Sequence, residues 1–362
     1  MTQWVNDLNL PPGKSQAGQY WSWITRCWSD SVCWRPRTGE FPQPWPLLSK
    51  PLLPVPAPIV INKHLWDIAD QRAVDLYQHA QHTNKKIAVL WSGGIDSTFV
   101  LISLLRNIPI TDHSRLVVYL NQHSILENID FFVEHIDQKI EHHYTDSLNI
   151  NNEWLGKHLC VSGEGGDSIF GRILPALRPL VNNARLHTHY RDNTNDIVAL
   201  LSKKHDVQFC SWFVRKINRN LSHSAYNSQV HSLLGWMWWV QYNFIFETKC
   251  FRPLMLFNKD NQPIASSLRD EYQSCIFFAD TDFQLWSFSN HGGLYDEDGG
   301  QHKEQAKQYI YDYDKNKTYR LYKRKTKSQL PTLQYRFYDR HWVGSNKSSI
   351  DVNECLEQFL IN

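Results

Sequence analysis

Two glycine-rich segments hold the residues of this sequence that are best suited to chemistry. The first is residues 92–97 (SGGIDS), and the second is residues 162–167 (SGEGGD). Glycines let the backbone approach a phosphate closely, and the serines add hydroxyl donors. Each segment also carries an aspartate, which would repel a phosphate unless a Mg²⁺ lay between the two anions. The two segments together therefore indicate a site for a polyphosphate and Mg²⁺.

The elements around these segments must bring them together. Residues 86–91 (KIAVLW) predict a short apolar strand and residues 98–105 a buried helix, with residues 92–97 between them. Alternating strands and helices predict an α/β fold, a parallel sheet flanked by helices. In such sheets ligands bind at the carboxyl ends of the strands, where both glycine segments fall. Further strands are predicted at residues 116–120, 141–144 and 159–161, and further helices at residues 62–83 and 127–140.

An ordinary turn is the alternative interpretation of residues 92–97. In that interpretation glycine supplies the backbone angles, and a serine or aspartate caps the helix that follows. The full SGGIDS pattern between a strand and a helix favours phosphate binding instead, because the free amides and the dipole at a helix start attract an anion. The pattern differs from Walker A, whose Gly-Lys-Ser/Thr ending is absent from it.

Residues 92–97 resemble the signature of the ATP-pyrophosphatase, or PP-loop, superfamily. Its members, which include asparagine synthetases, NAD synthetases, GMP synthetases and tRNA-modifying enzymes, split ATP into AMP and pyrophosphate. Residues 162–171 (SGEGGDSIFG) resemble the second motif of the asparagine synthetase domain, shared with β-lactam synthetases and lasso-peptide cyclases. The resemblance implies an adenine nucleotide alpha hydrolase-like fold and carboxylate activation with ATP and Mg²⁺.

The resemblance also implies roles for single residues. Asp96 and Asp167 would share the Mg²⁺, and Glu164 would be catalytic, as a proton acceptor for an attacking amine. Glu164 could also be an ordinary loop carboxylate. Ser168 and Arg172 stand where the family usually has an acidic residue and a second glycine, and Arg172 could alter the substrate pocket. The candidate ATP-binding residues are Ser92, Gly93, Gly94, Asp96, Ser97, Leu120 and Gly163.

Basic residues late in the chain are candidates for the site as well. In the family one lysine begins a helix and another follows in a basic turn, and they bind pyrophosphate and the tetrahedral intermediate. The resemblance favours Lys325, then Lys303, with Lys327 as an alternative. A solvated basic run is the competing interpretation. The family's Glu-x-Arg-x-Pro-Phe-Leu-Asp element has its nearest counterpart at residues 247–254 (ETKCFRPL), where the spacing is altered and the closing Asp is missing.

Composition narrows the class of protein. The net charge of +2 over 362 residues argues against a nucleic-acid surface. Seven cysteines make no disulfide framework, and reduced, mostly buried thiols are expected. No signal peptide and no membrane-spanning apolar run is visible, so a cytoplasmic protein without a membrane partner is expected. The most apolar stretch, residues 233–246, predicts a buried or interfacial helix.

Three regions are expected along the chain. Residues 1–61 form a Pro/Trp-rich arm, residues 62–180 the ATP-binding core, and residues 181–362 a mainly helical substrate lobe with a basic C-terminal segment. Thr2 stands where a glutaminase would expose a cysteine, and residues 1–85 are too few for that domain. Nitrogen would then come from ammonia, from an amine substrate or from a separate partner subunit.

The expected function is an ATP-dependent, AMP-forming amide ligase acting on a small-molecule carboxylate and an amine or ammonia. Two alternatives remain open from the sequence. One is a PP-loop enzyme that adenylates a nucleobase or tRNA carbonyl, against which the near-neutral charge argues. The other is a non-catalytic nucleotide-binding or assembly protein, which the divergent C-terminal half and the Trp-rich arm support.

Overall fold

A computed structural model describes residues 36–38, 51–145, 152–173, 175–180, 184–203, 206–257, 266–291 and 303–322. Lys325, Lys327 and most of the predicted N-terminal arm lie outside these residues. The part of the arm at residues 51–61 contains no helix or strand, as its prolines predict. Within the described residues, no helix combines the length and the apolar character needed to cross a membrane.

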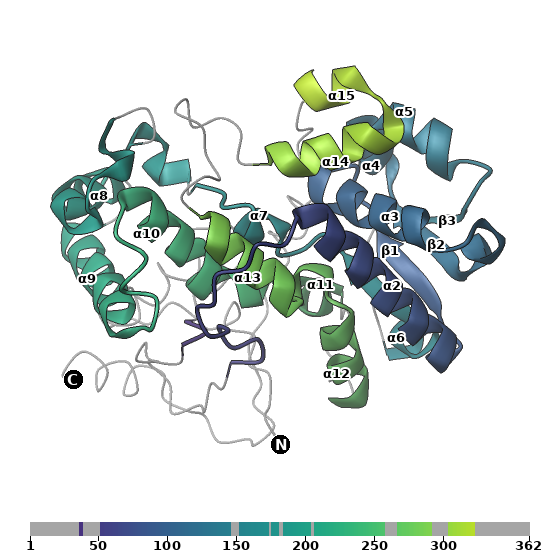
Figure 1. The fold of residues 1–362 in the computed structure, drawn as a ribbon, viewed down its shortest axis with the longest axis horizontal. Helices are drawn as coiled ribbons and strands as arrows, with labels where there is room; N and C mark the ends of the chain where they lie inside the picture. The colour runs from purple at the N-terminus through teal and green to yellow at the C-terminus, as the bar shows by residue number, and fades with distance from the viewer. Residues whose placement is uncertain are drawn as a thin grey trace.

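A four-stranded parallel sheet organises one half of the molecule, at the right of Figure 1. Its strands are β1 (Lys86–Leu90), β2 (Leu116–Leu120), β3 (Glu141–Tyr144) and β4 (His158–Ser162), in the order β3-β2-β1-β4. In register, Ile87 of β1 lies between Leu116 and Leu159. The chain moves outward from β1 to β3 and then returns to the opposite side of β1 for β4. The topological switch point therefore lies between β1 and β4, and each glycine segment starts there.

Helices cover this sheet, as the alternation predicts. α2 (Leu65–Thr83) and α3 (Ile95–Asn107) pack against each other and against β1, while α6 (Asn152–Lys157) and α12 (Ser266–Cys275) pack against β4. α14 (Glu304–Asp314) returns from late in the chain and packs along α3, followed by α15 (Lys317–Tyr322). Residues 303–322 therefore belong spatially to the sheet half of the molecule.

The long helix predicted at residues 127–140 is replaced by shorter turns. α4 (Gln122–Glu127) starts early because Asn121 and Ser124 form a capping box, which satisfies the first amides. Asn128 is buried and leaves the helical conformation, so α4 ends before it. α5 (Ile129–Phe131) and a π-helical turn, η3 (Phe132–Ile136), follow.

The other half of the described chain is helical, as predicted for the C-terminal lobe. It contains α8 (Thr194–Leu201), α9 (Val207–His223), α10 (Leu233–Trp239), the π-helical turn η7 (Val240–Ile245), α11 (Phe246–Phe257) and α13 (Thr281–Asn290). Residues 233–246 are completely buried, which confirms the predicted buried helix. The remaining short elements of the described chain, from both halves, are η2 (Ile110–Arg115), α7 (Gly166–Ile169), η4 (Pro175–Leu180), η5 (Ala184–His187), η6 (Tyr190–Asn193) and η8 (Phe277–Ala279).

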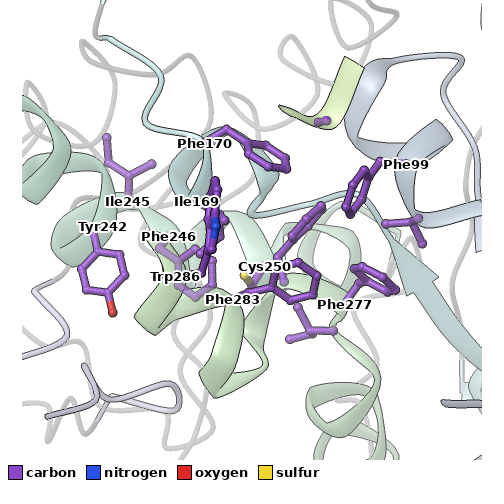
Figure 2. Close-up of a cluster of buried hydrophobic side chains, with 14 of the residues drawn as sticks. Phe99, Ile169, Phe170, Tyr242, Ile245, Phe246, Cys250, Phe277, Phe283 and Trp286 are labelled. Atoms are coloured by element: carbon purple, nitrogen blue, oxygen red, sulfur yellow. The ribbon is translucent and has the colours of Figure 1, made fainter. Parts of the chain in front are cut away.

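An aromatic core joins the two halves directly behind the second glycine segment. Figure 2 shows Phe99 of α3 beside Phe170, with Phe283 and Trp286 of α13 completing the group. Phe170 packs edge-on against both Phe99 and Trp286, with ring centroids 6.0 and 6.1 Å away. Ser287 also donates a hydrogen bond to the carbonyl of Ile169 at 2.6 Å. Because these contacts are buried, they fix the position of the second glycine segment relative to α3.

Candidate active site

The first glycine loop, residues 92–97, connects β1 to α3 and is stabilised by hydrogen bonds of its own serines. The Ser97 hydroxyl accepts a hydrogen bond from the Ser92 amide at 3.1 Å and donates one to the Gly94 carbonyl at 3.2 Å. Gly94, which has no side chain, is the N-cap of α3, so no side chain caps this helix. The ordinary capped turn is therefore not the arrangement found. The start of a 13-residue helix faces the switch point of the sheet.

The position of Gly93 requires a glycine. Its φ of +72° lies in the left-handed region, and an added Cβ would lie 2.2 Å from the carbonyl oxygen of Ser124. The loop is therefore pressed against the backbone of α4. On another side, the Tyr319 hydroxyl of α15 donates a hydrogen bond to the Gly93 carbonyl at 3.1 Å. α4 and α15 together hold the first glycine loop in place.

The second glycine loop, residues 162–167, packs directly on the start of α3. A Cβ added to Gly163 would lie 2.6 Å from the Ser97 amide, and one added to Gly166 would lie 2.7 Å from the carboxyl carbon of Asp96. Only glycines allow the two backbones to come so close. Asp96 is therefore enclosed by the second loop, although it belongs to the first.

α11 supports the second loop from behind. Gly165 has a φ of +89°, and an added Cβ would lie 2.8 Å from the Cys250 sulfur and 2.9 Å from the ring of Phe246. The buried guanidinium of Arg37 lies over the same Phe246 ring, 4.7 Å from its centroid. Burial, opposed by the charge of Arg37, raises the pKa of the Cys250 thiol, so Cys250 is a neutral packing residue here.

An ion cluster joins the two loops. The Nζ of Lys303 lies 2.6 Å from both carboxylate oxygens of Asp96 and 2.7 Å from Oδ1 of Asp167. The second oxygen of Asp167 binds Arg172 Nη1 at 2.8 Å and lies 3.5 Å from Lys249 Nζ. The structure therefore brings together three of the candidate site residues, Asp96, Asp167 and Lys303.

The charges in this cluster fix its protonation states. Burial alone would raise the pKa of Asp167, but Lys303, Lys249 and Arg172 outweigh it and hold this pKa well below its ordinary value. Burial likewise opposes the charge on Lys303, yet Asp167 and Asp96 raise the pKa of its ammonium above the ordinary value. Asp167 is therefore ionised and Lys303 is protonated at neutral pH.

Lys249 is the member of the cluster that sequence reasoning missed. It is 8% exposed and lies on α11, in the altered counterpart of the family's Glu-x-Arg element. A signal for it existed, because Lys249 follows Glu247 by two residues and keeps the positive charge of the family's arginine. Arg172 was expected to influence the substrate pocket, and the structure places it on Asp167.

The remaining predicted residues lie around this cluster. Glu164 is partly exposed, and its amide donates a hydrogen bond to the Ser162 hydroxyl at 3.3 Å. Leu120 ends β2 at the same edge of the sheet, but its side chain is buried, so only its backbone could contact a ligand. Ser92 is exposed at the start of the first glycine loop. The leading lysine candidate, Lys325, follows α15 outside the described residues.

The two carboxylates fit a shared Mg²⁺. They converge on one point, which the Lys303 ammonium marks at 2.6 and 2.7 Å from their oxygens. Mg²⁺ is typically held by one or two carboxylates, with phosphate oxygens and water as its other ligands. The described residues contain no group of three or more His, Cys, Asp or Glu side chains placed to hold a metal. Asp96 and Asp167 are the residues that would hold such an ion.

Comparisons of the chain with protein-family models, with curated proteins and with solved structures found no match. The geometry of the loops and of the ion cluster therefore provides the argument for function.

Proposed function

We propose that this protein is an ATP-dependent, AMP- and pyrophosphate-forming amide ligase of the asparagine synthetase-like type, built on a PP-loop fold. One observation carries the proposal. Two aspartates, each from a glycine loop at the topological switch point, meet at a single cation, the Lys303 ammonium. Carboxylates that converge in this way can hold a Mg²⁺ that neutralises a departing pyrophosphate.

The proposed reaction has two steps. First, the substrate carboxylate attacks the α-phosphorus of ATP, a new P–O bond forms, and the bond to the β-phosphate breaks. The amides at the start of α3 and the exposed hydroxyl of Ser92 suit the phosphates. Next, an amine or ammonia attacks the acyl-adenylate, AMP leaves, and Glu164 accepts the amine proton. Lys303 stabilises the charge that develops on the pyrophosphate.

Product analysis tests the proposal. The protein is incubated with ATP, Mg²⁺ and panels of carboxylates and amines, and AMP, pyrophosphate and new amides are measured by mass spectrometry. Asp96→Asn is expected to lower pyrophosphate release by about 100-fold or more, because charge stabilisation dominates such sites. Asp282→Asn is the control, since Asp282 pairs only at the surface with the exposed Lys63. Undiminished release by Asp96→Asn would overturn the proposal.

Two other outcomes would favour the alternatives. ATP binding without any AMP, over the whole panel of carboxylates and amines, would favour a non-catalytic nucleotide-binding protein. Retention of tRNA on a filter at moderate salt, with AMP formed only in its presence, would favour adenylation of a nucleic-acid carbonyl.

A further inference from the structure

Lys303 occupies the position that the proposed function gives to Mg²⁺. Its Nζ lies 2.6 Å from Asp96 and 2.7 Å from Asp167, and its side chain is 10% exposed. An ammonium and a Mg²⁺ would not share this position, because both would need the same carboxylate oxygens and the two cations repel each other. Lys303 and a bound Mg²⁺ therefore exclude each other at these carboxylates.

We infer that Lys303 has two positions, an inference that rests on the proposed function. In the metal-free protein Lys303 is the internal counter-ion that holds Asp96 and Asp167 together. When Mg²⁺ binds, the lysine leaves the carboxylates, and its ammonium becomes available to the phosphates of ATP. One residue thus neutralises the two carboxylates before Mg²⁺ binds and later binds the polyphosphate.

The position of Lys303 at the start of α14 suits a movement of its side chain. Lys303 is the N-cap of α14, with φ −129° and ψ 22°, so it lies outside the regular helix. α14 itself is anchored to the sheet half, because Ala306 and Ile310 are buried and Tyr309 donates a hydrogen bond to Asp70 at 2.5 Å. Rotation within the flexible four-carbon side chain is therefore enough, and α14 stays in place.

The other cations explain why Asp167 stays in position after the lysine leaves. Arg172 binds its Oδ2 at 2.8 Å, and Lys249 lies 3.5 Å from the same atom. Oδ1, which Lys303 releases, is the oxygen that becomes free for a metal. The arrangement divides the carboxylate into one oxygen held by permanent partners and one held by a movable partner.

Magnesium affinity tests this inference directly. Lys303→Met keeps much of the side-chain length but removes the competing charge, so titration calorimetry with Mg²⁺ alone is expected to give at least about tenfold tighter binding than in the wild type. Lys307→Met, one turn further along α14, is the matched control and should bind Mg²⁺ like the wild type. The metal-free Lys303→Met protein should also melt earlier and gain more from added Mg²⁺, because its two carboxylates have lost their counter-ion.

Chemical labelling of the wild-type protein provides a measurement that does not depend on folding of the variant. Acetylation of Lys303, followed by mass spectrometry of its peptide, should be slow without metal and at least about threefold faster with Mg²⁺ alone, because the amine leaves the carboxylates. Addition of ATP together with Mg²⁺ should slow the acetylation of Lys303 again, because the ammonium then binds the phosphates. Unchanged Mg²⁺ affinity in Lys303→Met, or labelling that Mg²⁺ does not alter, would overturn the inference.

The outcomes separate this inference from the proposed function. AMP formation by the wild type, with neither the tighter Mg²⁺ binding nor the labelling change, would overturn only the two positions of Lys303. Tighter Mg²⁺ binding and the labelling change, without AMP formation, would support the two positions of Lys303 and contradict the proposed ligase activity. No detectable Mg²⁺ binding by either protein would also overturn the inference, since Lys303 would then be a permanent structural partner.

Discussion

The two glycine loops have similar compositions but opposite surroundings. The first leads directly into the 13-residue helix α3, and its Ser92 is exposed. The second leads into α7, a helix of only four residues, and is enclosed between Asp96 and α11. Amides at the start of a long helix suit an anion, whereas a partly buried loop whose aspartate contacts three cations suits a fixed carboxylate. Similar patterns of glycine and aspartate thus stand in two settings, one at the start of a long helix and the other packed between α3 and α11.

Glycine substitutions should show the largest difference in stability between the two loops. Gly93→Ala is expected to lower the free energy of unfolding by about 3 kcal/mol or more, because its Cβ would meet a backbone oxygen at 2.2 Å in a left-handed conformation. Gly165→Ala should cost about 2 kcal/mol, since its Cβ meets only the side chains of Cys250 and Phe246, which can shift. Urea denaturation measures both. Equal costs would contradict the view that Gly93 is pressed on backbone and Gly165 on side chains.

Asp167→Asn should destabilise the protein by about 2 kcal/mol at neutral pH, because Lys303, Lys249 and Arg172 would lose a shared partner. The pKa of Asp167 is depressed in the folded state, so its stabilising contribution is complete above about pH 4, the usual value in unfolded chains, and disappears as the pH falls further. The difference between wild type and variant should therefore shrink below about pH 4 in denaturation at a series of pH values. A difference that stays constant there would show that the ion pairs do not stabilise Asp167.

Lys249→Met is expected to lower AMP formation by about tenfold, with a smaller effect on the KM for ATP, because Asp167 would lose one of the cations that fix its second oxygen. Lys216→Met on α9 is the control, since α9 contributes no residue to the ion cluster around Asp167. The measurement is steady-state release of pyrophosphate. A tenfold loss of pyrophosphate release in the control variant as well would show that Lys249 has no specific role in the site.

Tyr319→Phe should have the smallest effect, about 1 kcal/mol of unfolding free energy, because it removes the hydrogen bonds of the hydroxyl with the Gly93 carbonyl and with the Thr98 side chain but leaves the packing intact. The same substitution should loosen the first loop but not the second. Hydrogen exchange of the amides in the two loops, followed by mass spectrometry, measures this. Faster exchange in both loops would mean that α15 supports the sheet as a whole.

Local patterns were sufficient to predict the strands and both loops, but not the segment at residues 127–140. There the apolar spacing suggested one helix, while Asn121 began α4 early and the buried Asn128 ended it. Lys249 was missed for a different reason. Its element departs from the family spacing, and only the course of α11 brings it to Asp167.

The sequence by itself determined the parallel α/β sheet, the two glycine loops at its carboxyl edge, and the aspartates they carry. These features follow from short-range periodicity and from backbone angles that only glycine adopts readily. Only the tertiary structure decided that Asp96 is enclosed by the second loop, that Lys303 joins both aspartates, and that α15 reaches Gly93. Such contacts depend on how distant helices pack. For example, α11 brings Phe246 and Cys250 against Gly165, and no local pattern specifies that contact.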